Sequence, residues 1–164
     1  MVSLENISIP VTLMSGTYKI HVCTKRVWDM LKGCRSDADH EKVCGMLLEG
    51  VPLPLYEQRL LVQTYIKSMK RLRAEAELTL PYYKTEKSDD DVKYTIYTEF
   101  DKLAADYANI NLYEIDDIPI TEYWLILRDA FIYALSKTEK GREYLNNAYR
   151  LTQTEADEDI DIRK

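Results

Sequence analysis

The chain has 164 residues, 46% of them hydrophobic and 30% charged, which is enough to form one globular domain with its own core. Its formal net charge of -6 argues against a dedicated nucleic-acid-binding protein, because binding to phosphates needs a basic surface. No apolar run approaches the ~20 residues of a membrane span, and the first residues lack the features of a secretory signal. We therefore expect a cytoplasmic protein without a membrane partner.

The first 22 residues predict a β-hairpin. Apolar and polar residues alternate over 7–14 and again over 17–22, with Ser15 and Gly16 as the turn between the two runs. Pro10 cannot donate a hydrogen bond to a neighbouring strand, so we expect its strand to lie at the edge of a sheet.

Two short helices are expected next. Thr24 is the predicted cap of the first helix, which ends at Gly33. Ser36 is the predicted cap of the second, with Asp39 at the position that completes a capping box. The residues of this second helix that are expected to face inward are Val43, Met46 and Leu47.

A long helix follows a stiff connection. The prolines of 51–55 favour an extended stretch, because a proline disfavours helical backbone in the residue before it. From 56 to 78, apolar residues recur every three or four positions, which predicts one buried face of a helix. The expected members of this face are Leu61, Tyr65, Met69, Leu72 and Ala76.

Helical patterns also fill the second half of the chain. The same apolar spacing predicts a helix over 89–109. Thr121 is the expected cap of a helix over 122–136, and Thr138 is the expected cap of the last helix. The apolar stripe of the first of these helices is expected to contain Val92, Ile96, Phe100, Leu103 and Tyr107.

These patterns together predict an α+β fold that is mostly helical, with about five helices and an N-terminal β-hairpin. We expect one domain over residues 1–154, with the hairpin in 1–22 and the helices in 24–154. Residues 155–164 form an acidic tail, because five carboxylates lie within 155–161, a composition typical of disordered segments.

All cysteines and histidines lie within residues 21–44. His21 and Cys23 are two apart on a predicted strand, and His40 and Cys44 are four apart on a predicted helix, so each pair shares a face. Together they could supply the four ligands of a zinc ion, and this is our alternative hypothesis: a small zinc-binding regulatory module that contacts nucleic acid. We favour the interpretation that the cysteines are reduced core residues and that the protein has no cofactor, because free cysteine is among the most buried residue types.

The charge of the chain is uneven. Residues 1–80 hold 11 basic and 9 acidic residues, whereas residues 81–164 hold 11 and 19. A basic run in the first part could contact phosphates or an acidic partner; it could also be the solvated face of its helix, which the acidic chain favours. The basic residues of this run are Lys67, Lys70, Arg71 and Arg73.

The C-terminal half combines apolar helices with many tyrosines. Ten of the 13 tyrosines follow residue 80, and tyrosine is enriched in interfaces because its ring buries area while its hydroxyl stays hydrogen-bonded. The helix over 122–136 is apolar on more than half of its circumference, which indicates burial in the core or at an interface. The tyrosines could instead line the rim of the core. The candidate interface residues are Trp124, Phe131, Tyr133, Tyr144 and Tyr149, the first two of them as anchors of the core or of an interface.

Catalytic motifs are missing from the sequence. It contains no nucleophile elbow, no zinc-protease motif, no phosphate-binding loop and no dinucleotide fingerprint. Pairs of acids such as Asp116 and Asp117 lie in predicted exposed loops, where carboxyl groups keep ordinary pKa values and make poor general acids. We therefore expect that the protein is not an enzyme.

Part of the C-terminal segment, residues 121–154, is similar to a known group of proteins. Trp124, the run 127–130 (Leu-Arg-Asp-Ala) and the run 138–145 (Thr-Glu-Lys-Gly-Arg-Glu-Tyr-Leu) resemble the C-terminal helices of small proteins from tailed-bacteriophage structural gene clusters. Some of those proteins are tail-assembly or virion-completion factors. The resemblance covers about a fifth of the chain and includes no catalytic motif.

The resemblance implies a class of non-enzymatic proteins that bind other structural proteins. We therefore expect a protein–protein interaction or assembly factor of a bacteriophage virion or tail. Its expected partners are other structural proteins or further copies of itself. If the chain is phage-encoded, it would be found in the host cytoplasm or in the virion.

Overall fold

The computed structural model describes residues 7–82 and 98–161. It confirms the α+β fold, in which helices predominate and a two-stranded antiparallel hairpin lies at the N-terminus. The elements along the chain are β1 (Ser8–Leu13), β2 (Gly16–His21), α1 (Lys25–Gly33), α2 (Asp37–Leu47), α3 (Leu55–Glu75), α4 (Glu99–Ala108), the 3-10 turn η1 (Ile115–Asp117), α5 (Ile120–Ser136) and α6 (Glu139–Asp161).

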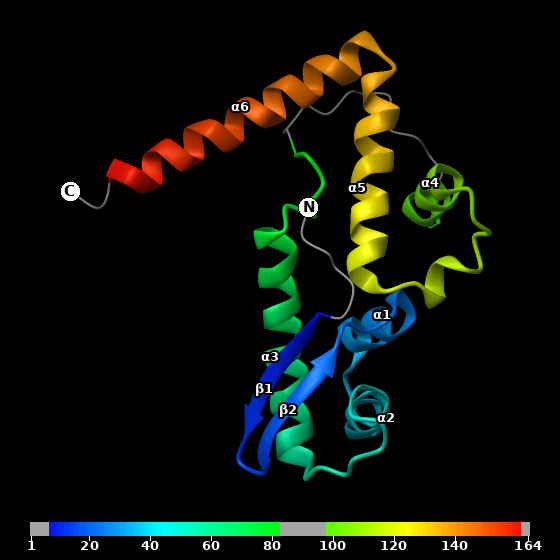
Figure 1. The fold of residues 1–164 in the computed structure, drawn as a ribbon, viewed down its shortest axis with the longest axis vertical. Helices are drawn as coiled ribbons and strands as arrows, with labels where there is room; N and C mark the ends of the chain where they lie inside the picture. Colours follow the sequence, from blue (N-terminus) through cyan, green and yellow to red (C-terminus); the bar gives the residue numbers. More distant parts are fainter. Residues whose placement is uncertain (1–6, 83–97, 162–164) are drawn as a thin grey trace.

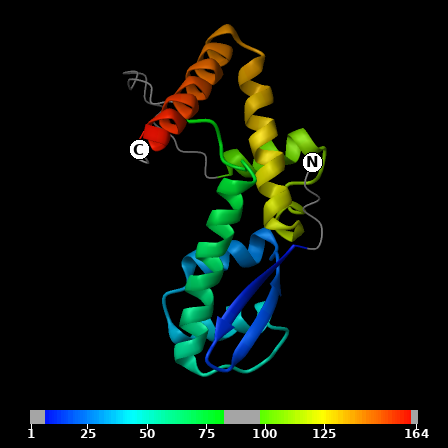
Figure 2. The same cartoon turned by 60° about the vertical axis from the view of Figure 1, so that its left-hand side comes forward.

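The molecule is elongated (Figure 1). The hairpin, α1, α2 and α3 form one end of it, and α4, α5 and α6 form the other. Helix α6 leaves the far end of α5 at a sharp angle and extends to one side, as the view in Figure 2 also shows. Among the helices of the described ranges, none has the combination of length and apolar character that crossing a membrane requires.

The predicted hairpin is confirmed. Its strands pair in the register Val11 with Tyr18, and Pro10 lies opposite Lys19 in a sheet to which the described residues contribute two strands. Ile9, Val11 and Leu13 are buried on the face that packs on α3, as their alternation predicts.

Both predicted helix caps of the first half are confirmed. The Thr24 hydroxyl accepts from the Val27 amide at 3.5 Å, and Ser36 with Asp39 forms the full capping box. The backbone amides of Ser36 and Arg35 donate to the Asp39 carboxylate, and these bonds lower its pKa to about 2.

One predicted inward residue of α2 is wrong. Met46 is about half exposed, whereas Val43, Cys44 and Leu48 are buried. Cys44 takes the centre of the buried face, and at 3.6 residues per turn a side chain two positions later lies about 200° round the helix. The apolar character of Met46 therefore did not decide its direction.

Helix α3 has the predicted buried face, and two of its polar residues fix the hairpin to it. Leu61, Tyr65 and Met69 have no exposed surface. The Tyr65 hydroxyl donates to the His21 carbonyl and accepts from the Cys23 amide, both at 3.0 Å. At the other end of the hairpin, the Ser15 amide donates to the buried Glu57 carboxylate at 3.2 Å.

The apolar stripe predicted for 89–109 is only partly right. In α4, Phe100 and Tyr107 are about half exposed, and the buried residues are Ala104 and Ala105. Small side chains let α4 lie close to α5, which explains why alanines take the contact. Two further predicted members, Val92 and Ile96, lie outside the described residues.

The predicted cap of α5 is wrong. Helix α5 begins at Ile120, so Thr121 is a buried residue of its first turn. The reason is a backbone bridge to the start of α1: the Lys25 amide donates to the Ile118 carbonyl, and the Ile120 amide donates to the Cys23 carbonyl, each at 2.9 Å. This bridge sets the direction of the chain before Thr121 is reached.

The junction between α5 and α6 depends on a glycine. The Thr138 hydroxyl accepts from the Gly141 amide at 3.0 Å, which confirms the predicted cap of the last helix. A Cβ atom at Gly141 would lie 2.0 Å from the Leu135 carbonyl oxygen, so only glycine fits this close turn. Beyond it, the backbone of α6 is helical as far as Asp161, which includes the acidic segment 155–161.

Candidate functional site

The four predicted zinc ligands do not form a metal site. Within residues 7–82 and 98–161, which include all four, no group of three His, Cys, Asp or Glu side chains could hold a metal ion. Cys23 and Cys44 are buried, and burial raises the pKa of each thiol to about 11. The His40 Nδ1 lies 2.7 Å from the carbonyl oxygen of Ser36, the residue that caps the helix to which His40 belongs. The two cysteines are therefore core residues, and the structure does not bring the four predicted ligands together.

A groove of about 530 Å³ lies between β2 and the end of α2. Most of its wall is apolar, from Val22 and Val27 to Leu47 and Val51. His21 and Cys23 also line it, but a thiol with a pKa of about 11 supplies almost no thiolate at neutral pH. The groove therefore lacks an activated nucleophile.

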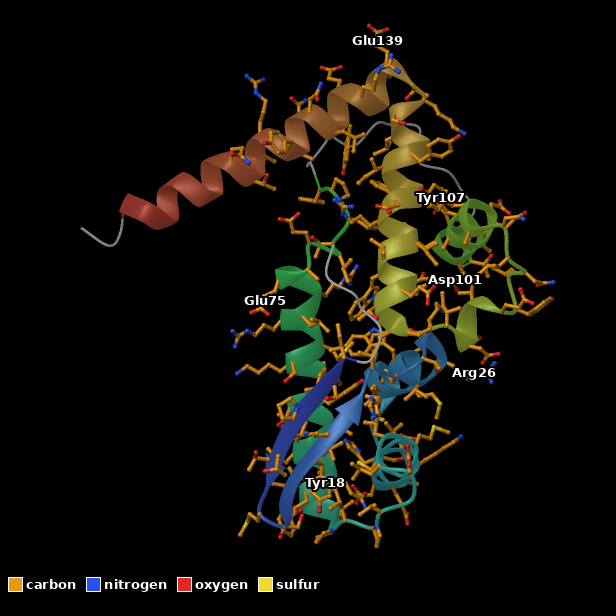
Figure 3. All side chains as sticks on the ribbon, viewed as in Figure 1. Tyr18, Arg26, Glu75, Asp101, Tyr107 and Glu139 are labelled. Atoms are coloured by element: carbon orange, nitrogen blue, oxygen red, sulfur yellow. The ribbon has the colours of Figure 1, made fainter. Side chains whose placement is uncertain are left out.

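Lys25 is a buried cation at the centre of a cluster of partly exposed carboxylates, where α1, α4, η1 and α5 meet. Its Nζ lies 2.9 Å from Asp29, 3.2 Å from Asp101 and 3.3 Å from Asp116. The Tyr123 ring lies 5.2 Å from this ammonium group, and its hydroxyl donates to Asp101 at 2.7 Å. In Figure 3, Asp101 on α4 and Arg26 on α1 lie on either side of this junction.

The charges of this cluster keep Lys25 protonated. Burial alone would lower the pKa of its ammonium group, but the hydrogen bond and charge of Asp29 and the charge of Asp101 raise the pKa above its ordinary value. Burial, and then the bond to Asp101, also raise the pKa of Tyr123. A protonated lysine is neither a nucleophile nor a base at neutral pH. We interpret the cluster as a structural link between the two ends of the molecule.

A second groove, of about 440 Å³, lies between α4 and α5, and we call it the α4–α5 groove. Its polar residues lie along the α4 side, and its apolar wall comes from both helices. Its lining residues are Thr98, Glu99, Phe100, Lys102, Leu103, Asp106, Phe131, Ala134 and Leu135.

Three of the five predicted interface residues lie near the junction of the two last helices: Phe131 and Tyr133 near the C-terminal end of α5, and Tyr144 near the start of α6. Phe131 lines the α4–α5 groove, and its ring packs edge-on against Tyr144 with 6.5 Å between centroids. Tyr133 is about half exposed. Its ring centroid lies 5.8 Å from that of Tyr107 on α4 and 4.1 Å from the Lys137 ammonium nitrogen. Of these aromatic residues, Tyr107 and Tyr133 are about half exposed, as is Phe100 of the groove.

The other two predicted interface residues lie elsewhere. Trp124 is only 3% exposed and packs edge-to-face on Trp28 with 5.3 Å between centroids, so it anchors the core and not a surface. Tyr149 lies farther along α6 and is 66% exposed. Sequence periodicity could not separate these cases, because both residues sit on helices with apolar stripes.

The structure also divides the predicted basic run. Lys67, Lys70 and Arg71 are exposed on the outer face of α3. Arg73 turns away from them: its guanidinium lies 5.0 Å above the Trp124 ring and donates to the Leu78 carbonyl at 3.2 Å. Arg73 is therefore a core contact, and only the first three residues form a basic surface.

Sequence reasoning missed two features of the candidate sites. Phe100 and Leu135 carried apolar signals, but nothing in their spacing indicates that they border a groove. The partners of Lys25 are up to 91 residues away in the sequence, and no local pattern connects them.

Comparison of the chain with protein families, with curated proteins and with solved structures found no match.

Proposed function

We propose that this protein is a non-enzymatic protein–protein interaction or assembly factor that serves in building a tailed-bacteriophage virion or tail. The observation that supports this most is the α4–α5 groove together with the exposed aromatic residues around it. Phe100 lines the groove with apolar side chains of both helices and is about half exposed. Tyr107 and Tyr133 are exposed to a similar extent and pack on each other from the same two helices. Aromatic residues at the mouth of an apolar groove are typical of sites that anchor another protein chain.

The chemistry of the buried polar groups supports the non-enzymatic part of the proposal. Lys25 is an ammonium group neutralised by surrounding carboxylates, and the two buried thiols have raised pKa values. Catalytic groups are usually tuned the other way, with an amine or thiol pKa lowered towards neutral pH. The similarity of residues 121–154 to phage structural proteins supports the assembly part.

Site-specific crosslinking tests the proposal in the cells where the chain is naturally made. A photoreactive amino acid at Phe100 should crosslink to a virion structural protein, because this side chain lies at the groove. The same group at Met14, which is exposed on the hairpin turn, serves as the control and should give no such product. An absence of any protein adduct at Phe100 would contradict the proposal.

A groove variant provides the second arm of the test. Ala134 is exposed and lines the groove, so Ala134→Glu places a charge there without disturbing the core. It should abolish the crosslink from Phe100 while thermal unfolding stays unchanged. Ala38→Glu, at an exposed position of α2, is the matched control and should leave the crosslink intact.

A further inference from the structure

We infer that the chain self-associates, with the C-terminal part of α6 of one copy docked on the outer face of α3 of a second copy. This goes beyond the proposed function, because neither surface belongs to the α4–α5 groove. Self-association through these two surfaces and binding of another protein at the α4–α5 groove can therefore occur independently.

The docking face is basic. Lys70 and Arg71 follow Lys67 by three and four residues on α3, which places all three on one face of the helix. Arg71 pairs with Glu75 at 2.6 Å, whereas Lys67 and Lys70 have no ion-pair partner among the residues that the structure describes. Figure 3 shows nitrogen-tipped side chains projecting outward from α3 beside Glu75. This face is thus an exposed positive surface on a chain that is acidic overall.

The docked segment, the C-terminal part of α6, has the complementary negative charge. Five carboxylates lie within residues 155–161, and no basic residue occupies the last turn of α6. Negative charge at the C-terminal end of a helix is unfavourable, because the helix dipole is also negative there. A basic surface against this end would offset both effects, and the outer face of α3 is such a surface.

The geometry favours a second copy over the same chain. Helix α6 packs on α5 near its start and then extends away from the body of the molecule. In both Figure 1 and Figure 2 its C-terminal end lies apart from α3. The acidic end of α6 is therefore positioned to reach outward to another molecule.

Apolar residues occur in a matching order on the two helices. On α3, the exposed Leu60 precedes the basic residues by about two turns. On α6, the exposed Leu151 precedes the middle of the acidic segment by a similar length. Two helices aligned in parallel would therefore bring the leucines together and the opposite charges together. A two-fold dimer would form this contact twice, and closed two-fold dimers are the commonest homo-oligomers.

The experiment is sedimentation of the purified full chain at low and high salt. We expect self-association at ~50 mM salt and about tenfold weaker association at ~1 M salt, where charges on exposed groups are screened within a few ångströms. A chain that stays monomeric at low salt up to the highest soluble concentration would overturn the inference.

Charge exchange between two variants makes the test specific. Lys67→Glu with Lys70→Glu should be monomeric, because it brings acidic residues against the acidic segment. Asp157→Lys with Glu158→Lys should be monomeric as well, because it removes most of the negative charge of residues 155–161 and places two lysines against the basic face. An equal mixture of the two should associate again, because the unchanged acidic segment of the first variant then meets the unchanged basic face of the second. Continued association of either variant alone, or a mixture that stays monomeric, would overturn the inference.

The matched control for the Lys67 and Lys70 variant is Lys42→Glu with Lys140→Glu, which changes the net charge by the same amount at exposed lysines outside both surfaces. It should associate as the natural chain does. Loss of association in this control would assign the effect to net charge and overturn the inference. Because only one purified chain is used, the result is independent of the crosslinking at Phe100.

Discussion

Replacing Lys25 with methionine should strongly destabilise the protein, because it removes the cation that three carboxylates surround. The Lys25 side chain is 8% exposed, and its Nζ lies within 3.3 Å of Asp29, Asp101 and Asp116. Methionine keeps most of the side-chain volume, so the loss is mainly electrostatic. Folding would then bring three carboxylates together without a positive charge between them.

The size of this loss follows from the burial of the partners. Removing one member of a fully buried ion pair costs about 3–5 kcal/mol. The three aspartate side chains are 44%, 30% and 47% exposed, so water screens part of their repulsion. We therefore expect the free energy of unfolding to fall by about 2–3 kcal/mol at pH 7, which corresponds to a fall of about 1 M in the urea midpoint.

The pH dependence identifies the mechanism. The folded-state pKa of Asp29 is lowered, despite its burial, by hydrogen bonds from Lys32 and Lys25. Its ion pair therefore stabilises the fold above the ordinary pKa of about 3.9 and is lost as the pH falls through the lower folded value. The pKa of Lys25 is raised, so its contribution is complete below about 10.4 and is lost as the pH rises through the folded value.

Urea unfolding of both proteins from pH 3 to pH 10 measures this effect. The difference in unfolding free energy should be constant from about pH 5 to pH 9 and should shrink towards pH 3. Lys32→Met is the control: it removes an exposed lysine that pairs with Asp29 at 2.7 Å and should cost less than about 1 kcal/mol. Equal stability of Lys25→Met and the natural protein, or a loss that does not shrink in acid, would refute this reasoning.

Three further predictions concern the core and the helix junction. Tyr65→Phe should lower the free energy of unfolding by about 1–3 kcal/mol in urea titrations, because it leaves the His21 carbonyl and the Cys23 amide unpaired. A thiol reagent at pH 8 should modify only the half-buried Cys34 in the native protein, since the other two thiols are buried with pKa values of about 11. Gly141→Ala should lower stability by about 1–3 kcal/mol in thermal unfolding, because its Cβ overlaps the Leu135 carbonyl.

The two substitutions each have a matched control. Tyr133→Phe removes a hydroxyl from a half-exposed ring and should leave stability unchanged within about 0.5 kcal/mol. Gly45→Ala, within α2, has no atom within 4 Å of the new Cβ and should raise stability by about 0.5–1 kcal/mol. A Tyr65→Phe protein as stable as the natural one, three thiols that react at one rate, or equal effects of the two alanines would contradict these accounts.

Local signals in the sequence predicted the parts of the fold that depend on neighbouring residues. The Ser36 capping box, the hairpin turn and the buried face of α3 were correct, because each is determined within a few residues or by one helix period. Met46 and Thr121 were wrong because contacts from other elements decided their environment. In α4, helix packing selected alanines over larger apolar residues.

The candidate sites were harder to predict than the fold. By sequence, Lys25 is an ordinary lysine in the first turn of a helix. Only the folded chain brings Asp101 and Asp116 to it. Arg73 belonged to a basic run by sequence, yet it lies over the Trp124 ring, because the end of α3 meets α5 there. Groupings of this kind depend on long-range contacts, which a single sequence does not encode in any short pattern.

The central claim is that this chain works by binding other protein chains. The most direct measurement is its native mass after gentle isolation from the cells that make it. We predict a complex well above the 19.2 kDa of one chain, containing a virion structural protein or further copies of the chain. A single species at 19.2 kDa under every condition of isolation would contradict the claim.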